Sequence, residues 1–209
     1  MLRPGNPEDK IIIQRRGQRI YRIVMEGKPL RPGKSSRTPE VLKVVFTALQ
    51  GITELSSKKE RYAISPIEIK TEAFPMLLPH RVTANLLVSY LNREYADKIE
   101  EKIREQLNIK GIFAALTLIS DRPPFKERAN SKALLRRLKR IAEKWDIPLN
   151  TESSLWPSVA GLVPSKIPVL CGMGPVARDL YTQKEAVQRI SLIHRALLLS
   201  NLLFETVEE

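Results

Sequence analysis

The sequence has little of the chemistry that most catalytic and metal sites need. Its 209 residues include one cysteine, Cys171, and two histidines, His80 and His194. A single cysteine excludes an internal disulfide, and no HExxH, CxxC, P-loop, GxGxxG or GxSxG motif occurs. The histidines are not at ligand spacing, so we expect His194 to pack within an apolar helix and Cys171 to be a small buried side chain. A Ser–His or Cys–His pair that only folding brings together stays open.

Long hydrophobic runs are also missing. Residues 1–7 contain no apolar core of the kind that a signal peptide has, and no segment approaches the roughly 20 apolar residues of a membrane-spanning helix. The single cysteine is typical of a reducing compartment. These features predict a cytoplasmic protein without a membrane partner.

Charge is the strong feature of the composition. The chain has 35 Lys and Arg against 23 Asp and Glu, a net charge of +12 and an isoelectric point near 10.0. The densest basic run, residues 136–140, alternates with apolar residues at helical spacing, which predicts the solvated face of an amphipathic helix. No zinc finger, KH-type GxxG loop or aromatic-rich basic strand accompanies it. We therefore do not expect nucleic acid to be the main partner.

Hydrophobic periodicity predicts an α+β fold whose larger part has a β-α-β-β-α-β order. The expected strands are residues 19–25, 62–69, 84–91 and 112–119, and the expected helices are 38–52, with Thr38 as N-cap, and 96–107. This order is the ferredoxin-like arrangement, an antiparallel sheet with two helices on one face. We assign it to a domain of residues 17–120.

The remaining residues, 1–16 and 121–209, are expected to form a partial α/β half-domain. Its predicted elements are a strand at 11–13, a helix at 131–144, a loop at 151–163, a buried strand at 168–171 and a long helix at 184–204. The second half of the last helix is apolar nearly all round, which is typical of a helix that is covered on most sides. Either residues 1–16 or another chain must supply that cover.

Several stretches, taken in order, resemble the M20 family of zinc metallopeptidases, and its glutamate carboxypeptidase branch most. These stretches are residues 2–5, 15–17, 27–33, 121–125, 131–135, 167–175, 185–187 and 191–196. The resemblance covers nearly the whole chain. It implies a ferredoxin-like lid that mediates dimerisation, followed by the C-terminal half of a catalytic domain that hydrolyses amide bonds with two zinc ions. Most zinc ligands and the general base of the family lie ahead of the lid, and the resemblance places Met1 almost where the lid begins.

The functional positions of the family that this chain covers carry mostly other residue types. A zinc-ligating acid falls at Arg3 and a zinc-ligating histidine at Tyr181. An arginine stays cationic and a phenol has a pKa of about 10, so neither suits zinc near neutral pH. Three further positions, which in the family hold a histidine that reaches across the dimer, a substrate-contacting asparagine and a substrate-binding arginine, are occupied here by Arg31, Met76 and Ser89.

One functional position is retained, because Arg122 matches the arginine that holds the carboxylate of the substrate. The plainer interpretation of Arg122 is an ion pair with an acidic neighbour, Asp121 or Glu127. Arg122 and Arg31 are thus the candidates for binding a substrate or another anion. We expect no catalytic residue and no metal ligand in this chain, and zinc only if a partner chain supplies the missing ligands.

These replacements favour a non-catalytic protein that works by association. The expected assembly is a homodimer through the lid, with a second polypeptide as a possible cover for the 184–204 helix. One alternative is the lid-bearing subunit of a split zinc-dependent amidohydrolase or carboxypeptidase. Another is a basic module whose loop at 31–37 binds phosphate or nucleic acid ahead of a helix N-terminus.

Overall fold

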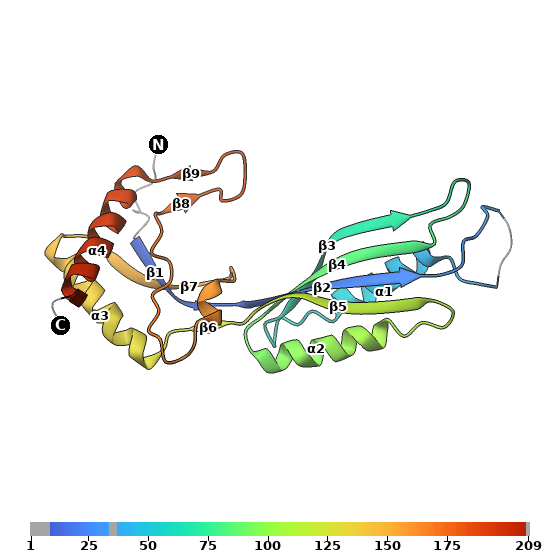
Figure 1. The fold of residues 1–209 in the computed structure, drawn as a ribbon, viewed down its shortest axis with the longest axis horizontal. Helices are drawn as coiled ribbons and strands as arrows, with labels where there is room; N and C mark the ends of the chain where they lie inside the picture. The colour runs from blue at the N-terminus through green and yellow to red at the C-terminus, as the bar shows by residue number, and fades with distance from the viewer. Residues whose placement is uncertain (1–8, 34–36, 208–209) are drawn as a thin grey trace. The chain divides into compact units, whose positions relative to one another are not determined.

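The chain folds into two compact units, which are described separately here. The computed structural model describes residues 9–33 and 37–207, so Arg3 lies outside the described residues. One unit is Arg16–Pro124, and the other combines Met1–Arg15 with Phe125–Glu209. The described residues form a mixed fold of four α-helices and several sheets (Figure 1), which confirms the predicted α+β class.

The unit Arg16–Pro124 contains one antiparallel sheet and two helices. Its elements are β2 (Gly17–Glu26), α1 (Val41–Glu54), β3 (Ala63–Glu72), β4 (Arg81–Tyr90), α2 (Arg93–Gln106) and β5 (Phe113–Arg122). The strands lie in the order β3-β4-β2-β5, with β2 and β4 in the centre. The β-α-β-β-α-β order along the chain is the one that the hydrophobic periodicity predicts.

Alternation along the central strands decides which face of this sheet is covered. In β2, Tyr21, Ile23 and Met25 are buried, and in β4 every second residue from Val82 to Tyr90 is buried. Because side chains alternate between the two faces of a strand, these residues share one face. There they pack with the buried residues of α1 and α2 in a single hydrophobic core.

The first helix begins three residues later than Thr38, the predicted N-cap. Glu40 is the N-cap, with extended backbone and without a side-chain capping hydrogen bond. Thr38 and Pro39 therefore lie ahead of the helix and not at its N-cap and first helical position. Val41, which is 1% exposed, is the first helical residue and also the first to enter the core.

The second unit is built on a three-stranded sheet with β1 in its centre. The elements are β1 (Asp9–Arg15), β6 (Phe125–Lys126), α3 (Ala129–Lys144), β7 (Leu149–Ser154), a 3-10 turn η1 (Val159–Leu162), β8 (Ala177–Arg178), β9 (Ala186–Val187) and α4 (Arg189–Val207). Strand β1 pairs with β6 antiparallel and with β7 in parallel. Strands β8 and β9 form a small separate hairpin.

Two predictions in this unit are wrong. The expected strand at 168–171 is an extended segment that makes one isolated bridge, in which Ile12 N donates to Cys171 O at 2.8 Å. Pro168 has no N–H to give to a ladder, and Gly172 turns the chain away with φ +84°. Conversely, the expected loop at 151–163 contains most of β7. The sequence of β7 is polar and does not indicate a strand, but its backbone pairs with that of β1.

Helices α3 and α4 bury one face each in a shared core. Leu135, Leu138 and Ile141 of α3 pack with Leu198 and Leu202 of α4. α4 begins at Arg189 rather than at residue 184, because Ala186–Val187 pair in the hairpin.

α4 is covered on one side only within the described part of the chain. Its opposite side, called here the outer face of α4, consists of exposed Ile190, Leu192, Ile193, Ala196, Leu199, Leu203 and Phe204. Of the two alternatives for covering this helix, residues 1–16 or another chain, the described residues 9–16 contribute on the inner side only, where Ile11 packs with Leu198 and Leu202. None of the described helices is both long enough and apolar enough to cross a membrane.

Candidate functional site

Tyr181 lies at the tip of the β8–β9 hairpin. Its side chain is 82% exposed, and its backbone N–H donates to Glu185 Oε2 at 2.8 Å. Thr182 closes the turn, because its backbone N–H and its hydroxyl both donate to Asp179 O, at 3.1 Å and 2.7 Å. The loop is thus held by its backbone and by Glu185, while the phenol extends outward.

The backbone at Tyr181 is left-handed, with φ +66°, and Asp179 two residues earlier has φ +51°. Among residues other than glycine, this region is enriched several-fold in asparagine, aspartate and histidine. The conformation of the tip therefore suits the histidine that the family resemblance implies at this position better than it suits a tyrosine. The loop geometry and the residue type do not match.

The ring of Tyr181 has one aromatic neighbour. It lies 5.8 Å from the ring of Trp156, measured between centroids, with the planes tilted by 53°. Trp156 follows β7 and is itself 61% exposed. Aromatic pairs prefer such tilted arrangements, so the pair forms an exposed apolar surface at the position where the family resemblance implies a zinc ligand.

Arg15, at the end of β1, organises the residues beneath this surface. Its Nε lies 3.0 Å from Cys171 Sγ, and one terminal nitrogen donates to Ser154 Oγ at 3.1 Å and to Trp156 O at 3.3 Å. Ser158 Oγ lies 3.6 Å from the same sulfur. Cys171 is 8% exposed, which confirms the predicted burial. Sequence reasoning missed the cluster because its members are up to 156 positions apart and no local motif links them.

Arg122, the retained arginine, is the last residue of β5 and is exposed. The predicted ion pair with Asp121 or Glu127 is wrong, since within the described residues Arg122 makes no ion pair. The cause is strand geometry, because neighbouring residues point to opposite faces. Asp121 turns toward the helices, where it accepts a hydrogen bond from Tyr90 Oη at 2.9 Å and lies 3.3 Å from Arg19 Nε.

Arg122 shares a cross-strand row with the position at which the family has its second substrate-binding arginine. Gln18 of β2 is paired with Arg122 on one side and with Ser89 of β4 on the other. Arg16 donates from Nε to Ser89 Oγ at 2.8 Å and from a terminal nitrogen to Ser89 O at 3.1 Å. A guanidinium therefore does lie against position 89, although it comes from Arg16, the residue between β1 and β2.

Arg31 and Met76 belong to two loops that are hydrogen-bonded to each other. Leu78 N donates to Leu30 O at 2.8 Å, which joins the loop after β2 to the turn before β4. Arg31 is exposed, and Met76 is 90% exposed with a left-handed φ of +64°. As at Tyr181, the backbone keeps a form that favours asparagine while the side chain is another type.

No group of three or more His, Cys, Asp or Glu side chains gathers as a possible metal site within residues 9–33 and 37–207. Of the predicted positions, Arg122 and Ser89 lie in one cross-strand row, on either side of Gln18. The loops that contain Arg31 and Met76 are hydrogen-bonded to each other. Tyr181 belongs to the other unit.

The chain has been compared with known proteins at three levels. No protein-family model and no curated protein matches its sequence. Solved structures do match. An amidase of the hydantoinase/carbamoylase family from Burkholderia multivorans gives a TM-score of 0.62 at 14% identity, over 90% of this chain and 47% of that chain.

Two further matches are peptidases. Aminopeptidase PepT from Bacillus cereus gives a TM-score of 0.70 at 17% identity, over 93% of this chain and 53% of that chain. The YXEP protein of Bacillus subtilis, a dinuclear metal-binding peptidase from the M20 family, gives 0.63 at 15% identity, over 98% of this chain and 53% of that chain. The fold is that of M20 peptidases and amidohydrolases. The chain spans about half the length of the proteins that it matches.

Proposed function

We propose that this chain is a non-catalytic protein with an M20-like fold that acts by association. In this proposal Arg16–Pro124 is a ferredoxin-like lid, and the other unit is a remnant of the catalytic domain nearest to the glutamate carboxypeptidase branch. The order of elements, the sheet order β3-β4-β2-β5 and the structural neighbours support it. The single cysteine supports a reducing compartment such as the cytoplasm.

The main support for loss of catalysis is Tyr181. At the position that the resemblance gives to a zinc-ligating histidine, the structure has an exposed phenol packed on Trp156. A neutral phenol is a weak ligand compared with the imidazole and carboxylate groups that hold zinc in proteins. Arg3, the other altered ligand position, lies outside the described residues.

Strand β5 supports dimerisation through the lid. It is an edge strand of the sheet, and residues 113–120 carry no charge, with Phe113, Leu118 and Ile119 exposed. An edge of this kind is a template for pairing with another chain. The opposite edge, β3, contains Pro66 and charged residues, which are features that discourage edge pairing.

The outer face of α4 supports a second contact. Seven of its side chains are apolar and exposed, whereas its inner face buries Leu198 and Leu202. Contiguous exposed apolar residues of this extent mark interaction sites. We propose that another polypeptide covers this face.

A split hydrolase is the second candidate, and one observation favours it. The chain matches only about half of each structural neighbour, so a separate polypeptide with the missing half could cover the outer face of α4 and bring zinc ligands. Tyr181 counts against it, because the ligand at that position would still be missing. Arg122, exposed and without an ion pair in the described part of the chain, is our candidate for holding a carboxylate in either case. Arg31 is a weaker one, as residues 34–36 of its loop lie outside the described residues.

A zinc titration of the purified chain tests the loss of the metal site. By calorimetry we expect no saturable zinc binding by the wild-type chain. The matched variant Tyr181→His is expected to remain equally inert, because one restored ligand does not make a site of the three or four ligands that zinc requires. Tight stoichiometric binding by the wild-type chain would contradict the proposal.

A further inference from the structure

Helix α3 carries a large share of the net positive charge of the chain. Its sixteen residues include six cationic side chains and one acidic side chain, a local charge of +5 out of the total of +12. Helix α2, of similar length, has four cationic and five acidic side chains and a local charge of −1. The strongly basic character of α3 is therefore not shared by every solvated helix.

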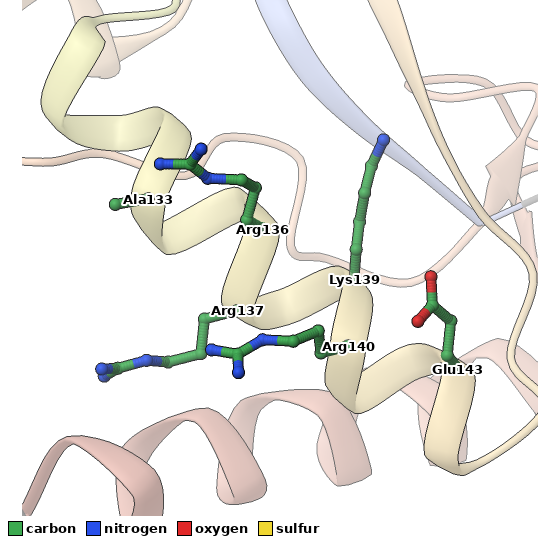
Figure 2. A pocket seen from close by; sticks show the side chains of 6 residues that line it. All are labelled: Ala133, Arg136, Arg137, Lys139, Arg140 and Glu143. Carbon is green, nitrogen blue, oxygen red and sulfur yellow. The ribbon is translucent and has the colours of Figure 1, made fainter.

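The structure places these charges around a hollow. A shallow groove of about 540 Å³ is lined by Ala133, Arg136, Arg137, Lys139, Arg140 and Glu143. Figure 2 shows the four cationic side chains projecting from successive turns of α3, with the small Ala133 among them. Arg136 and Arg140 are exposed, and Lys139 is half-buried. Sequence periodicity alone predicts a solvated face here, but not that its cations line a common groove.

One acidic side chain lines the groove. It is Glu143, the only acidic residue of α3. Lys144, which lies outside the groove, is paired with Glu205 at 3.4 Å. Like charges on neighbouring turns repel one another. A ligand with several closely spaced negative charges would relieve this repulsion and be attracted by each of the cations.

We propose that the outer face of α3 binds the phosphate backbone of a nucleic acid. A clustered stripe of Lys and Arg along one helix, in a chain with an isoelectric point near 10.0, is the electrostatic footprint of such binding. Three of the cations are arginines, whose planar guanidinium groups bind phosphate oxygens in pairs. The proposal adds a partner to the association proposed above and does not depend on it.

The packing of α3 favours a nucleic acid over a lipid surface. A helix that binds a membrane inserts an apolar face between lipids. In α3 the apolar residues Leu135, Leu138 and Ile141 are already buried in the core of the unit. The exposed residues of α3 that line the groove are charged except for the small Ala133, which suits a ligand recognised by its phosphates.

Fluorescence anisotropy with a labelled DNA duplex tests the proposal. We expect affinity to fall with salt at a logarithmic slope of about −3 to −4, as for about four neutralised phosphates. The variant Arg136→Glu/Arg140→Glu is expected to bind at least about tenfold more weakly. Its matched control, Lys98→Glu/Lys102→Glu, changes two exposed residues of α2 and lowers the net charge equally, and it should keep most of the affinity. Unfolding curves establish that both variants are folded.

Three results would overturn the proposal. The first is that the wild-type chain binds neither the duplex nor a single strand. The second is that the α2 control loses as much affinity as the α3 variant, which would mean that net charge alone is responsible. The third is that the chain binds phosphatidylserine vesicles or polyglutamate but not the oligonucleotides, which would assign the face to a membrane or an acidic protein.

Discussion

A terminal nitrogen of Arg19 in β2 lies 2.7 Å from Asp97 Oδ1 in α2, and this contact joins the sheet of the unit Arg16–Pro124 to its second helix. The arginine side chain is 5% exposed, whereas that of Asp97 is 64% exposed. Arg19 Nε also lies 3.3 Å from Asp121 Oδ2, on β5. One buried cation thus holds three elements of the unit together. Burial alone would lower the pKa of Arg19, but its interactions with Asp97, Tyr21 and Asp121 raise the pKa above its ordinary value.

Removing Arg19 should be far more costly than removing Asp97. Arg19→Ala leaves Asp121 partly buried without its main cation, and we expect the free energy of unfolding to fall by about 3 kcal/mol. Asp97→Asn removes an exposed partner and should cost less than about 1 kcal/mol. Urea unfolding of both variants measures this. Equal effects would mean that Arg19 is not the centre of the network.

Stability should decline at alkaline pH because of two buried tyrosines. Burial raises the pKa of Tyr21, and burial with the hydrogen bond to Asp121 raises that of Tyr90. In the unfolded chain both phenols lose their protons near pH 10, before they do so in the folded protein. The stabilisation is therefore complete below about pH 10 and is lost as pH rises further. In Tyr21→Phe and Tyr90→Phe this decline should be shallower, and an unchanged slope would contradict the assignment.

Gly172 should be intolerant of a side chain. A Cβ there would lie 2.8 Å from Ile12 Cγ1 and 3.1 Å from Ile12 N, and its φ of +84° is unfavourable for other residues. We expect Gly172→Ala to lower the free energy of unfolding by about 2 kcal/mol. Gly174→Ala is the control, because a Cβ there meets no atom within 4 Å, and it should change stability by less than about 0.5 kcal/mol. Thermal unfolding compares the two, and similar losses would be inconsistent with this packing.

The proposed dimer edge can be tested with a pair of lysine substitutions. Ile119 on β5 is 47% exposed and Ile67 on β3 is 51% exposed, so neither is needed for the core. A charge on the pairing edge should block association. We expect Ile119→Lys to be monomeric and Ile67→Lys to remain dimeric in analytical ultracentrifugation. A dimer in both variants would place the interface elsewhere.

Periodicity was enough to predict the elements of the unit Arg16–Pro124, and the reason lies in its strands. In β2 and β4 every second residue is buried and the residues between them are more accessible, and α1 and α2 carry a regular apolar stripe. The local sequence of each element therefore indicates whether it is a helix or a strand and which of its faces is buried. The start of α1 was predicted too early. Thr38 and Pro39 are typical of a helix start, but the helix begins at Val41, the residue that packs in the core.

The other unit was harder because its elements depend on distant partners. Strand β7 is mostly polar and forms because β1 pairs with it. The 168–171 segment is apolar, but it makes a single bridge, to Ile12, and is not a strand. The cluster of Arg15, Ser154 and Cys171 likewise joins residues that no local pattern connects. The family resemblance pointed to Tyr181 and Arg122 as positions that bear on function. It did not predict the left-handed backbone of Tyr181, or that Arg122 makes no ion pair within the described residues.

Native mass spectrometry of the protein purified from its own source tests the central claim most directly, since one spectrum reads both assembly and bound metal. The proposed function predicts a homodimer without zinc. A complex with a second polypeptide that carries two zinc ions would contradict it, and would show that the chain is half of an active hydrolase despite Tyr181.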